Sequence, residues 1–398
     1  MTGRISLKLR AVAIVVLIVL IAILETRQPF GVFRLITFGA VFLLLADLVS
    51  LLRGSWRDFA LMLASLAFGL FLIEAAGNVW GPRDPIVSSP DGLYAPRPVL
   101  GWGPSRAGRF VSERIDPGTG AALYRATYTV DSNLLRQTES CEKGPAVVFF
   151  GCSFTFGLGL NDADTLPQLL ADSIDRKVRI LNLAFAGYGP HQFLSELQAG
   201  IFDSVIGPQP KLFVFVTAPW HAERTACRSR YGLNAPRYKI ENGQPILKGV
   251  CYEGLGLRFI EWLAASAGYR WLIEPYWRRV NHDDVELYIQ ITVAAVKLAK
   301  TKYRVPVIIL DPGWERDDYL EGTGFTPGAV NQRFREGGAV VIDATLDKEM
   351  AAGVTLNIPG DGHPTALANR LRASILKNYL EQNMPEVLAA TPLRAQRD

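Results

Sequence analysis

The distribution of apolar residues constrains this chain most, because nearly all the long apolar runs of its 398 residues lie in residues 1–80. Three runs occur there, at residues 11–24, 35–52 and 59–76. A helix needs about 20 apolar residues to cross the roughly 30 Å hydrocarbon layer. The second and third runs can span it with some tilt, whereas the first is short enough to be a signal-peptide core. No small-residue cleavage pattern follows the first run, so we predict a membrane anchor with three spans.

Basic residues predict how this anchor is oriented. Arg4, Lys8 and Arg10 precede the first run, and Arg53 and Arg57 lie between the second and third runs. The positive-inside rule places both groups in the cytoplasm and residues 81–398 outside it. In a bacterium this means a multi-pass protein of the inner membrane with its larger part in the periplasm. The lipid bilayer is therefore an expected partner.

Two acidic residues, Asp47 and Glu74, lie inside the apolar runs. Ionisable residues within spans often have a function. Because both lie near the ends of their runs, we interpret them as residues that reach the lipid headgroups.

The overall composition excludes several classes of protein. The formal net charge is +4 and charged residues are 20% of the chain, which disfavours a nucleic-acid-binding protein. Four cysteines in 398 residues exclude a small disulfide-stabilised fold. Neither a CxxC nor an HExxH motif occurs, so we expect no metal site and no cofactor.

The remainder of the chain is predicted to form an α/β domain over residues 145–398, preceded by a lead-in segment with short strands over 81–144. Strands are expected at residues 146–150, 178–183, 212–217, 305–310 and 339–342, and helices at 165–174, 191–202, 285–300, 327–335 and 364–381. Such alternation predicts a parallel sheet with helices on both faces and a site at the carboxyl ends of its strands. Residues 222–283 interrupt the alternation as an insertion.

The first strand is followed by Gly151, Cys152 and Ser153. A serine that opens a loop directly after a buried strand is well placed to be a nucleophile, and its N–H can help to hold an oxyanion. Ser153 could equally be a helix N-cap. Thr155 replaces the second glycine of a G-x-S-x-G elbow, and no P-loop lysine follows. Cys152 is an alternative thiol nucleophile.

The second strand is expected to end at Leu183, directly after Asn182, and is followed by a turn that contains Gly187 and Gly189. Glycines allow a ligand to approach the backbone closely, so the Gly187 N–H is a candidate oxyanion donor. Asn182 is a further candidate contact. The same glycines are also compatible with ordinary turn chemistry.

A histidine must activate the serine, and His363 is the best candidate among four. Asp361 precedes it by two residues and could orient the imidazole, as in a catalytic triad. Pro364 suits the first position of the helix that follows. Ser153, Asp361 and His363 would then lie on loops at one edge of the sheet.

Three blocks of sequence resemble the SGNH/GDSL hydrolase superfamily: "FFGCSFTFGLGL", "NLAFAGYG" and "DGHPTALANRL". The resemblance covers roughly residues 145–381. It implies a flavodoxin-like three-layer sandwich with a central five-stranded parallel sheet, and ester hydrolysis or acyl transfer on Ser153. Gly187 matches the oxyanion glycine, and Asp361 and His363 match the last block. The upstream "YTVDSNLLR" resembles the lead-in of membrane-anchored bacterial members.

The sequence departs from the family pattern at three places. Cys152 replaces the aspartate before the nucleophile, and the Asp–His spacing is two residues instead of three. The third block lacks its asparagine donor, because the third strand ends in "VTAPWH", which contains no asparagine. His221 could replace this donor or contact the substrate.

The insertion is rich in aromatic residues and arginines, and Cys227 and Cys251 bracket part of it. A disulfide between these cysteines is permitted in the periplasm. The aromatic side chains could stack on sugar rings, or they could pack a small subdomain.

Together these patterns predict a membrane-anchored extracytoplasmic serine esterase. It would hydrolyse or transfer O-acyl groups, such as acetyl, on envelope glycans or small esters. The alternative is a non-catalytic glycan-binding or envelope-assembly module that retains the same sandwich.

Overall fold

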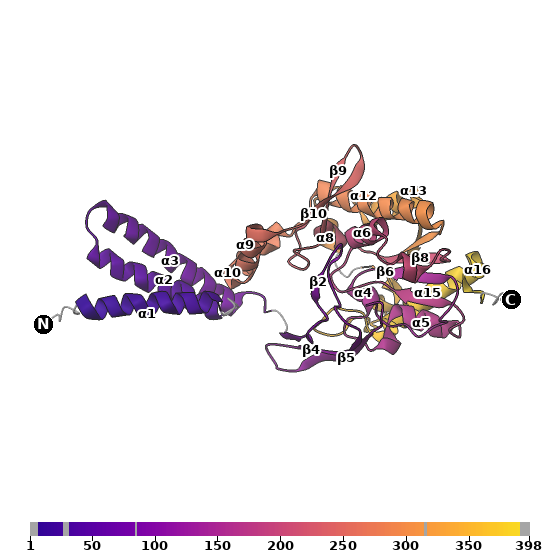
Figure 1. Ribbon diagram of the computed structural model, residues 1–398, viewed down its shortest axis with the longest axis horizontal. Helices are drawn as coiled ribbons and strands as arrows, with labels where there is room; N and C mark the ends of the chain where they lie inside the picture. Colours follow the sequence, from indigo (N-terminus) through magenta and orange to yellow (C-terminus); the bar gives the residue numbers. More distant parts are fainter. Residues whose placement is uncertain (1–6, 27–31, 84–85, 314–316, 391–398) are drawn as a thin grey trace. The chain divides into compact units, whose positions relative to one another are not determined.

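A computed structural model describes residues 7–26, 32–83, 86–313 and 317–390. The chain divides into two compact units. Residues Met1–Asp84 and Glu253–Arg278 make up the helical unit, and Pro85–Tyr252 and Arg279–Asp398 make up the sandwich unit. Figure 1 shows the long helices of the first unit in indigo and the sheet of the second in magenta and orange. Arg4 and Arg27, two basic residues near the predicted spans, lie outside the described residues.

Within its described residues, the helical unit has three long and three short helices. They are α1 (Leu7–Thr26), α2 (Val32–Leu51), α3 (Ser55–Trp80), α9 (Gly254–Ala264), α10 (Ala267–Leu272) and α11 (Glu274–Trp277). Two of them, α2 over Arg34–Leu51 and α3, are long and apolar enough to cross a membrane. Only 17% and 22% of their residues are buried in the protein, unlike the core helix of a soluble domain. The apolar part of α1, Leu9–Leu24, is shorter.

The two acidic residues of the apolar runs have different environments. Asp47 forms an ion pair with Arg10, whose Nε lies 3.8 Å from its Oδ1. Glu74 does not reach outward, and our interpretation of it was wrong. Its side chain is buried, and its carboxylate accepts hydrogen bonds from Ser266 and from the first N–H groups of α10. These N–H groups have no partner within their own helix and need an acceptor.

The sandwich unit is built on a five-stranded sheet in the order β7-β6-β8-β11-β12, and every pair in it is parallel. The strands are β6 (Ala146–Phe150), β7 (Arg179–Asn182), β8 (Leu212–Val216), β11 (Val307–Asp311) and β12 (Val340–Asp343). Their bounds agree with the expected ones within two residues. The chain first adds β7 on one side of β6 and then β8 on the other, so the strand order reverses at β6. A crevice at the carboxyl ends of the strands is expected there.

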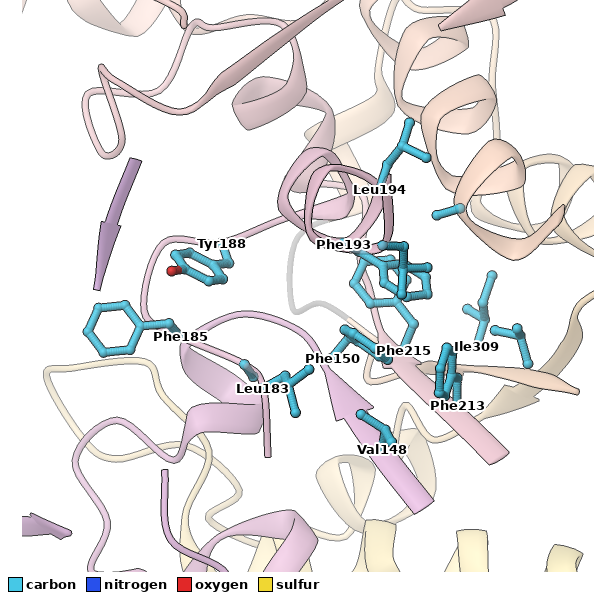
Figure 2. Packing of buried hydrophobic residues seen from close by; sticks show 14 of the residues in the cluster. Val148, Phe150, Leu183, Phe185, Tyr188, Phe193, Leu194, Phe213, Phe215 and Ile309 are labelled. Carbon is cyan, nitrogen blue, oxygen red and sulfur yellow. The ribbon is translucent and has the colours of Figure 1, made fainter. Parts of the chain in front are cut away.

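Two apolar cores cover the two faces of the sheet and make it a three-layer sandwich, as predicted. Side chains alternate along a strand, so Val148 and Phe150 of β6 face one core and Val147 and Phe149 face the other. The first core includes α6 (Pro190–Ala199), α12 (His282–Leu298) and α13 (Pro327–Glu336). The second includes α5 (Leu166–Ser173) and α15 (Ala366–Asn383). Figure 2 shows Phe150 of the first core against Phe193 of α6, with ring centroids 4.3 Å apart.

The lead-in folds as part of the sandwich unit. Its strands are β1 (Ile86–Ser88), β2 (Ala95–Arg97), β3 (Gly101–Gly103), β4 (Gly108–Ile115) and β5 (Ala122–Val130). Strands β4 and β5 form an antiparallel hairpin with β1 at its edge. Arg136 bridges the end of β5 to Asn182 of the main sheet.

The residues of the predicted insertion are shared between the two units. Residues 253–278 belong to the helical unit, and the flanking residues belong to the sandwich unit. The sandwich part carries a hairpin of β9 (Pro236–Glu241) and β10 (Gln244–Val250). A disulfide joins Cys227 to Cys251, whose Cα atoms are 5.4 Å apart.

Short helical segments complete the described residues. They are α4 (Ser153–Phe156), η1 (Asp162–Asp164), α7 (Asp203–Ile206), α8 (His221–Thr225), η2 (Ala299–Tyr303), η3 (Asp317–Leu320), α14 (Asp347–Ala351) and α16 (Pro385–Leu388).

Candidate active site

Ser153 lies at the point where β6 turns into the short helix α4. Gly151 makes the turn possible, because a Cβ at this position would lie 2.3 Å from the Thr155 hydroxyl oxygen. Cys152 adopts an extended backbone before the helix and its side chain is buried. Ser153 is therefore the first helical residue rather than the N-cap, and it is 5% exposed.

His363 and Asp361 form a hydrogen-bonded pair in the loop before α15. The His363 Nδ1 lies 2.6 Å from Asp361 Oδ2, and the His363 N–H donates to the same oxygen at 3.0 Å. The bond to a carboxylate assigns the proton to Nδ1, which leaves Nε2 as the proton acceptor. The loop is closed by the Ile358 N–H, which donates to the His363 carbonyl at 2.7 Å.

Arg114 is a third member of this group, and the sequence analysis missed it. Its Nη1 lies 2.6 Å from Asp361 Oδ1, so both carboxylate oxygens of Asp361 have a partner. Arg114 belongs to β4, 247 residues away in the chain. No local signal marks it, because the contact depends on how the lead-in hairpin packs on the sandwich.

The electrostatics of this group keep Asp361 ionised. Its side chain has no exposed surface, and burial alone raises the pKa of a carboxyl group. The hydrogen bond from His363, the charge of that ring and the charge of Arg114 outweigh the burial and hold the pKa of Asp361 below its usual value. An ionised carboxylate can orient an imidazole and stabilise it when it becomes charged.

The imidazole lies against the turn that carries Ser153. Phe154, the next residue, presents its ring edge-on to His363, with centroids 5.8 Å apart. The Phe154 ring also contacts the Trp220 ring, which follows β8, with centroids 5.2 Å apart. Loops after β6, β8 and β12 thus meet at the carboxyl edge of the sheet, where the sequence predicted a site.

The backbone of Gly187 is shaped to leave its N–H available. Gly187 has φ +86°, and a Cβ there would lie 2.9 Å from the Trp102 ring. Trp102 holds the turn by donating its indole N–H to the Ala186 carbonyl at 2.8 Å. Among the described residues, neither the Gly187 N–H nor the Ser153 N–H donates to a protein acceptor. Two such donors are the parts of an oxyanion hole.

Asn182 stabilises the turn after β7 through hydrogen bonds of its side chain. Its side chain is buried, its Nδ2 donates to the Thr155 carbonyl at 3.0 Å, and its Oδ1 accepts from the Ala184 N–H at 3.2 Å. Asn182 therefore connects the end of β7 to α4. Both polar ends of its side chain have partners inside the fold.

His221, the expected substitute for the missing asparagine, is completely buried. Its Nδ1 lies 2.8 Å from the Thr217 hydroxyl, which also contacts the Tyr288 hydroxyl at 2.9 Å. Burial, reinforced by the charge of Arg224 and the neighbouring His191, holds the pKa of His221 well below its usual value. The ring is therefore neutral, and in this conformation it has no surface to offer a substrate.

Among the residues that the structure describes, no group of three or more His, Cys, Asp or Glu side chains could hold a metal ion. The residues brought together at the site supply a hydroxyl, an imidazole, a carboxylate with its arginine, and two backbone N–H groups. Such a set can carry out nucleophilic acyl transfer.

Comparisons with known proteins give the following. No family model matches the sequence, and no curated protein matches it. Solved structures similar to this chain include the esterase EstA from Pseudoalteromonas sp., with 13% identity and a TM-score of 0.35 over 60% of this chain and 98% of that one. They also include a GDSL-like lipase from Bacteroides thetaiotaomicron VPI-5482, with 12% identity and a TM-score of 0.34 over 62% of this chain and 93% of that one. A third is a carbohydrate acetylesterase family member from Sinorhizobium meliloti, with 11% identity and a TM-score of 0.34 over 60% of this chain and 98% of that one.

Proposed function

We propose that this protein is a serine ester hydrolase or O-acyl transferase that uses Ser153 as its nucleophile. The observation that carries the proposal is the Asp361–His363 pair, whose imidazole lies beside the turn of Ser153. A buried carboxylate on Nδ1 makes an imidazole a better general base. A serine at a strand end needs such a base to attack an ester.

The reaction would proceed in two halves. The Ser153 Oγ attacks the ester carbonyl carbon while its proton passes to His363 Nε2. The N–H groups of Ser153 and Gly187 hold the oxyanion of the tetrahedral intermediate. The carbon–oxygen bond to the alcohol then breaks, and His363 returns the proton to the leaving oxygen. In the second half, water or a sugar hydroxyl attacks the acyl carbon while His363 takes its proton. The bond from that carbon to Ser153 Oγ then breaks, and His363 returns the proton to Oγ.

Asp361 and Arg114 act on the histidine rather than on the substrate. Asp361 fixes the tautomer of His363 and stabilises the imidazolium that forms in each half of the reaction. Arg114 holds the second carboxylate oxygen, and its charge adds to the effect of His363 in lowering the pKa of the carboxyl group. Arg114 is therefore a positioning residue.

We further propose that the enzyme is anchored in a bacterial inner membrane and that its sandwich unit lies in the periplasm. The apolar helices α2 and α3 support the anchor, and the positions of Arg53 and Arg57 support the orientation. The Cys227–Cys251 disulfide supports an oxidising compartment. Esters available at that location include O-acylated envelope glycans, which are the proposed substrate class.

Hydrolysis of 4-nitrophenyl acetate by the full chain in detergent tests the proposal. The Ser153→Ala variant should lose at least about 10³-fold in kcat/KM. Ser173→Ala is the matched control, because Ser173 is an exposed serine on α5, and it should retain the full rate. Equal rates for Ser153→Ala and the unmodified chain would exclude the serine and favour a non-catalytic glycan-binding module.

A further inference from the structure

Helix α9 has an apolar face that the described residues leave largely exposed. Leu255, Phe259 and Trp262 are spaced as i, i+4 and i+7, so they lie on one side of the helix. Their side chains are 82%, 58% and 39% exposed. No residue of α9 is buried, although most of its side chains are apolar. An exposed stripe of this kind marks a surface that binds something.

The helical unit fixes α9 and α10 to one end of its two long apolar helices. Helices α2 and α3 are antiparallel, because Phe42 contacts Phe68 and Gly39 lies against Phe71. The start of α2 and the end of α3 are therefore at the same end. Counting from Ser55 at 1.5 Å per residue, Glu74 lies about 29 Å along α3, close to the thickness of the hydrocarbon layer.

Both buried charges at this end bind the α9–α10 segment. Arg34 of α2 donates to the Trp262 carbonyl at 3.0 Å, and its guanidinium lies 4.4 Å from the centre of the Trp262 ring. Glu74 of α3 accepts from the Ser266 hydroxyl at 2.6 Å and from the Ala267 N–H at 2.8 Å. Each of the two charged side chains is 1% exposed. Charged groups that deep in an apolar unit require partners, and here α9 and α10 supply them.

Close backbone packing also fixes α10 against the same end of α3, near Glu74. A Cβ on Gly77 would lie 2.6 Å from the backbone of α10, so only glycine allows the two helices to approach. Trp80 at the end of α3 contacts Trp271 of α10, with centroids 6.3 Å apart. Trp80 remains largely exposed. Tryptophans at the end of an apolar helix are typical of the membrane–water interface.

We propose that α9 is an interfacial helix, and that its Leu255, Phe259 and Trp262 face inserts into the surface of the bilayer that α2 and α3 cross. The inference rests on the proposed membrane anchor and is independent of the proposed esterase. Arg258 and Glu261 are both exposed and lie beside the apolar face, and Arg258 suits lipid phosphate groups. A helix with an exposed face of Leu, Phe and Trp that is flanked by charged residues is the type that lies in the headgroup region.

Site-specific fluorescence in liposomes tests the proposal. Among the described residues the free cysteines are Cys141, which is partly exposed, and Cys152, which is buried. The full chain with Cys141→Ser would carry Phe259→Cys or Glu261→Cys labelled with NBD. It would be reconstituted into phosphatidylglycerol and phosphatidylcholine vesicles with or without spin-labelled lipids. The label at position 259 should shift to the blue and lose more than half of its emission to the spin-labelled lipid. The label at position 261, on the same helix, should respond several-fold less.

Each other outcome overturns the proposal in a distinguishable way. Equal and weak quenching at both positions, in protein that floats with the vesicles, would mean that the anchor holds and α9 stays in water. A blue-shifted label at position 259 that lipid spin labels do not quench would mean that a second copy or another protein covers the face. Protein that does not float with the vesicles would overturn the anchor as well. None of these results depends on ester hydrolysis.

Discussion

His363 and His221 both follow strands of the same sheet, yet their surroundings have opposite effects on the ability of the imidazole to accept a proton. The His363 side chain keeps 16% of its surface exposed and its Nδ1 contacts the ionised Asp361. The His221 side chain has no exposed surface and its Nδ1 contacts the neutral Thr217 hydroxyl. A carboxylate partner prepares an imidazole to accept a proton, whereas burial beside Arg224 prevents it. The general base is therefore identified by the group that contacts its Nδ1, because both candidates are histidines.

The largest effect is expected when His363 and His221 are replaced in turn, and this experiment tests the comparison between them. His363→Ala should lower kcat/KM by about 10⁴-fold, because it removes the general base. His221→Phe should mainly lower stability, by about 1–3 kcal/mol, since it leaves the Thr217 hydroxyl with one partner fewer. Ester hydrolysis and thermal unfolding of both variants would be measured in the same detergent. A rate loss in His221→Phe as large as that in His363→Ala would give His221 a part in the chemistry.

The buried histidines should make stability depend on pH. His191 lies beside His221, and burial followed by the charge of Arg224 lowers its pKa to about 3. An unfolded histidine titrates near 6.5, so below that pH the unfolded chain binds a proton that the folded chain does not. Stability therefore falls with decreasing pH, by about 2 kcal/mol for His191 between pH 7 and pH 5.

His191→Leu removes that titration and should reduce the loss of Tm between pH 7 and pH 5. The transition would be followed by tryptophan fluorescence, with His282→Leu as the control because His282 is exposed. An unchanged pH dependence in His191→Leu would show that the pKa of His191 is the same in the folded and the unfolded chain, which would contradict the lowered pKa.

Replacing Arg114 has the smallest expected effect of these tests, and it shows how Asp361 acts on His363. Arg114→Gln should lower kcat/KM about tenfold, the cost of one charge-assisted hydrogen bond. Without the guanidinium, the pKa of Asp361 rises, because one of the charges that lower it is lost. The acid limb of the pH–rate profile should therefore move to higher pH, and Arg114→Lys should partly restore it. A profile that is only scaled down, with its acid limb in place, would reduce Arg114 to a structural contact.

The sequence predicted the parallel sheet because its strands are short apolar runs whose bounds depend on local composition. It also predicted that loops after different strands would meet, since parallel strands end at one edge. It could not predict Arg114, whose contact with Asp361 depends on the packing of a hairpin 247 residues away. Nor could it predict that Glu74 turns inward, because residues 266–268, which bind it, look like part of an uninterrupted insertion.

The central claim is that the Ser153 hydroxyl is the group that His363 activates, and mass mapping of a fluorophosphonate adduct tests it most directly. The full chain in detergent would be treated with the reagent and digested, and the modified residue identified by mass spectrometry. The account predicts an adduct on Ser153 that is absent in the His363→Ala variant. An unmodified Ser153, or equal modification with and without His363, would contradict it.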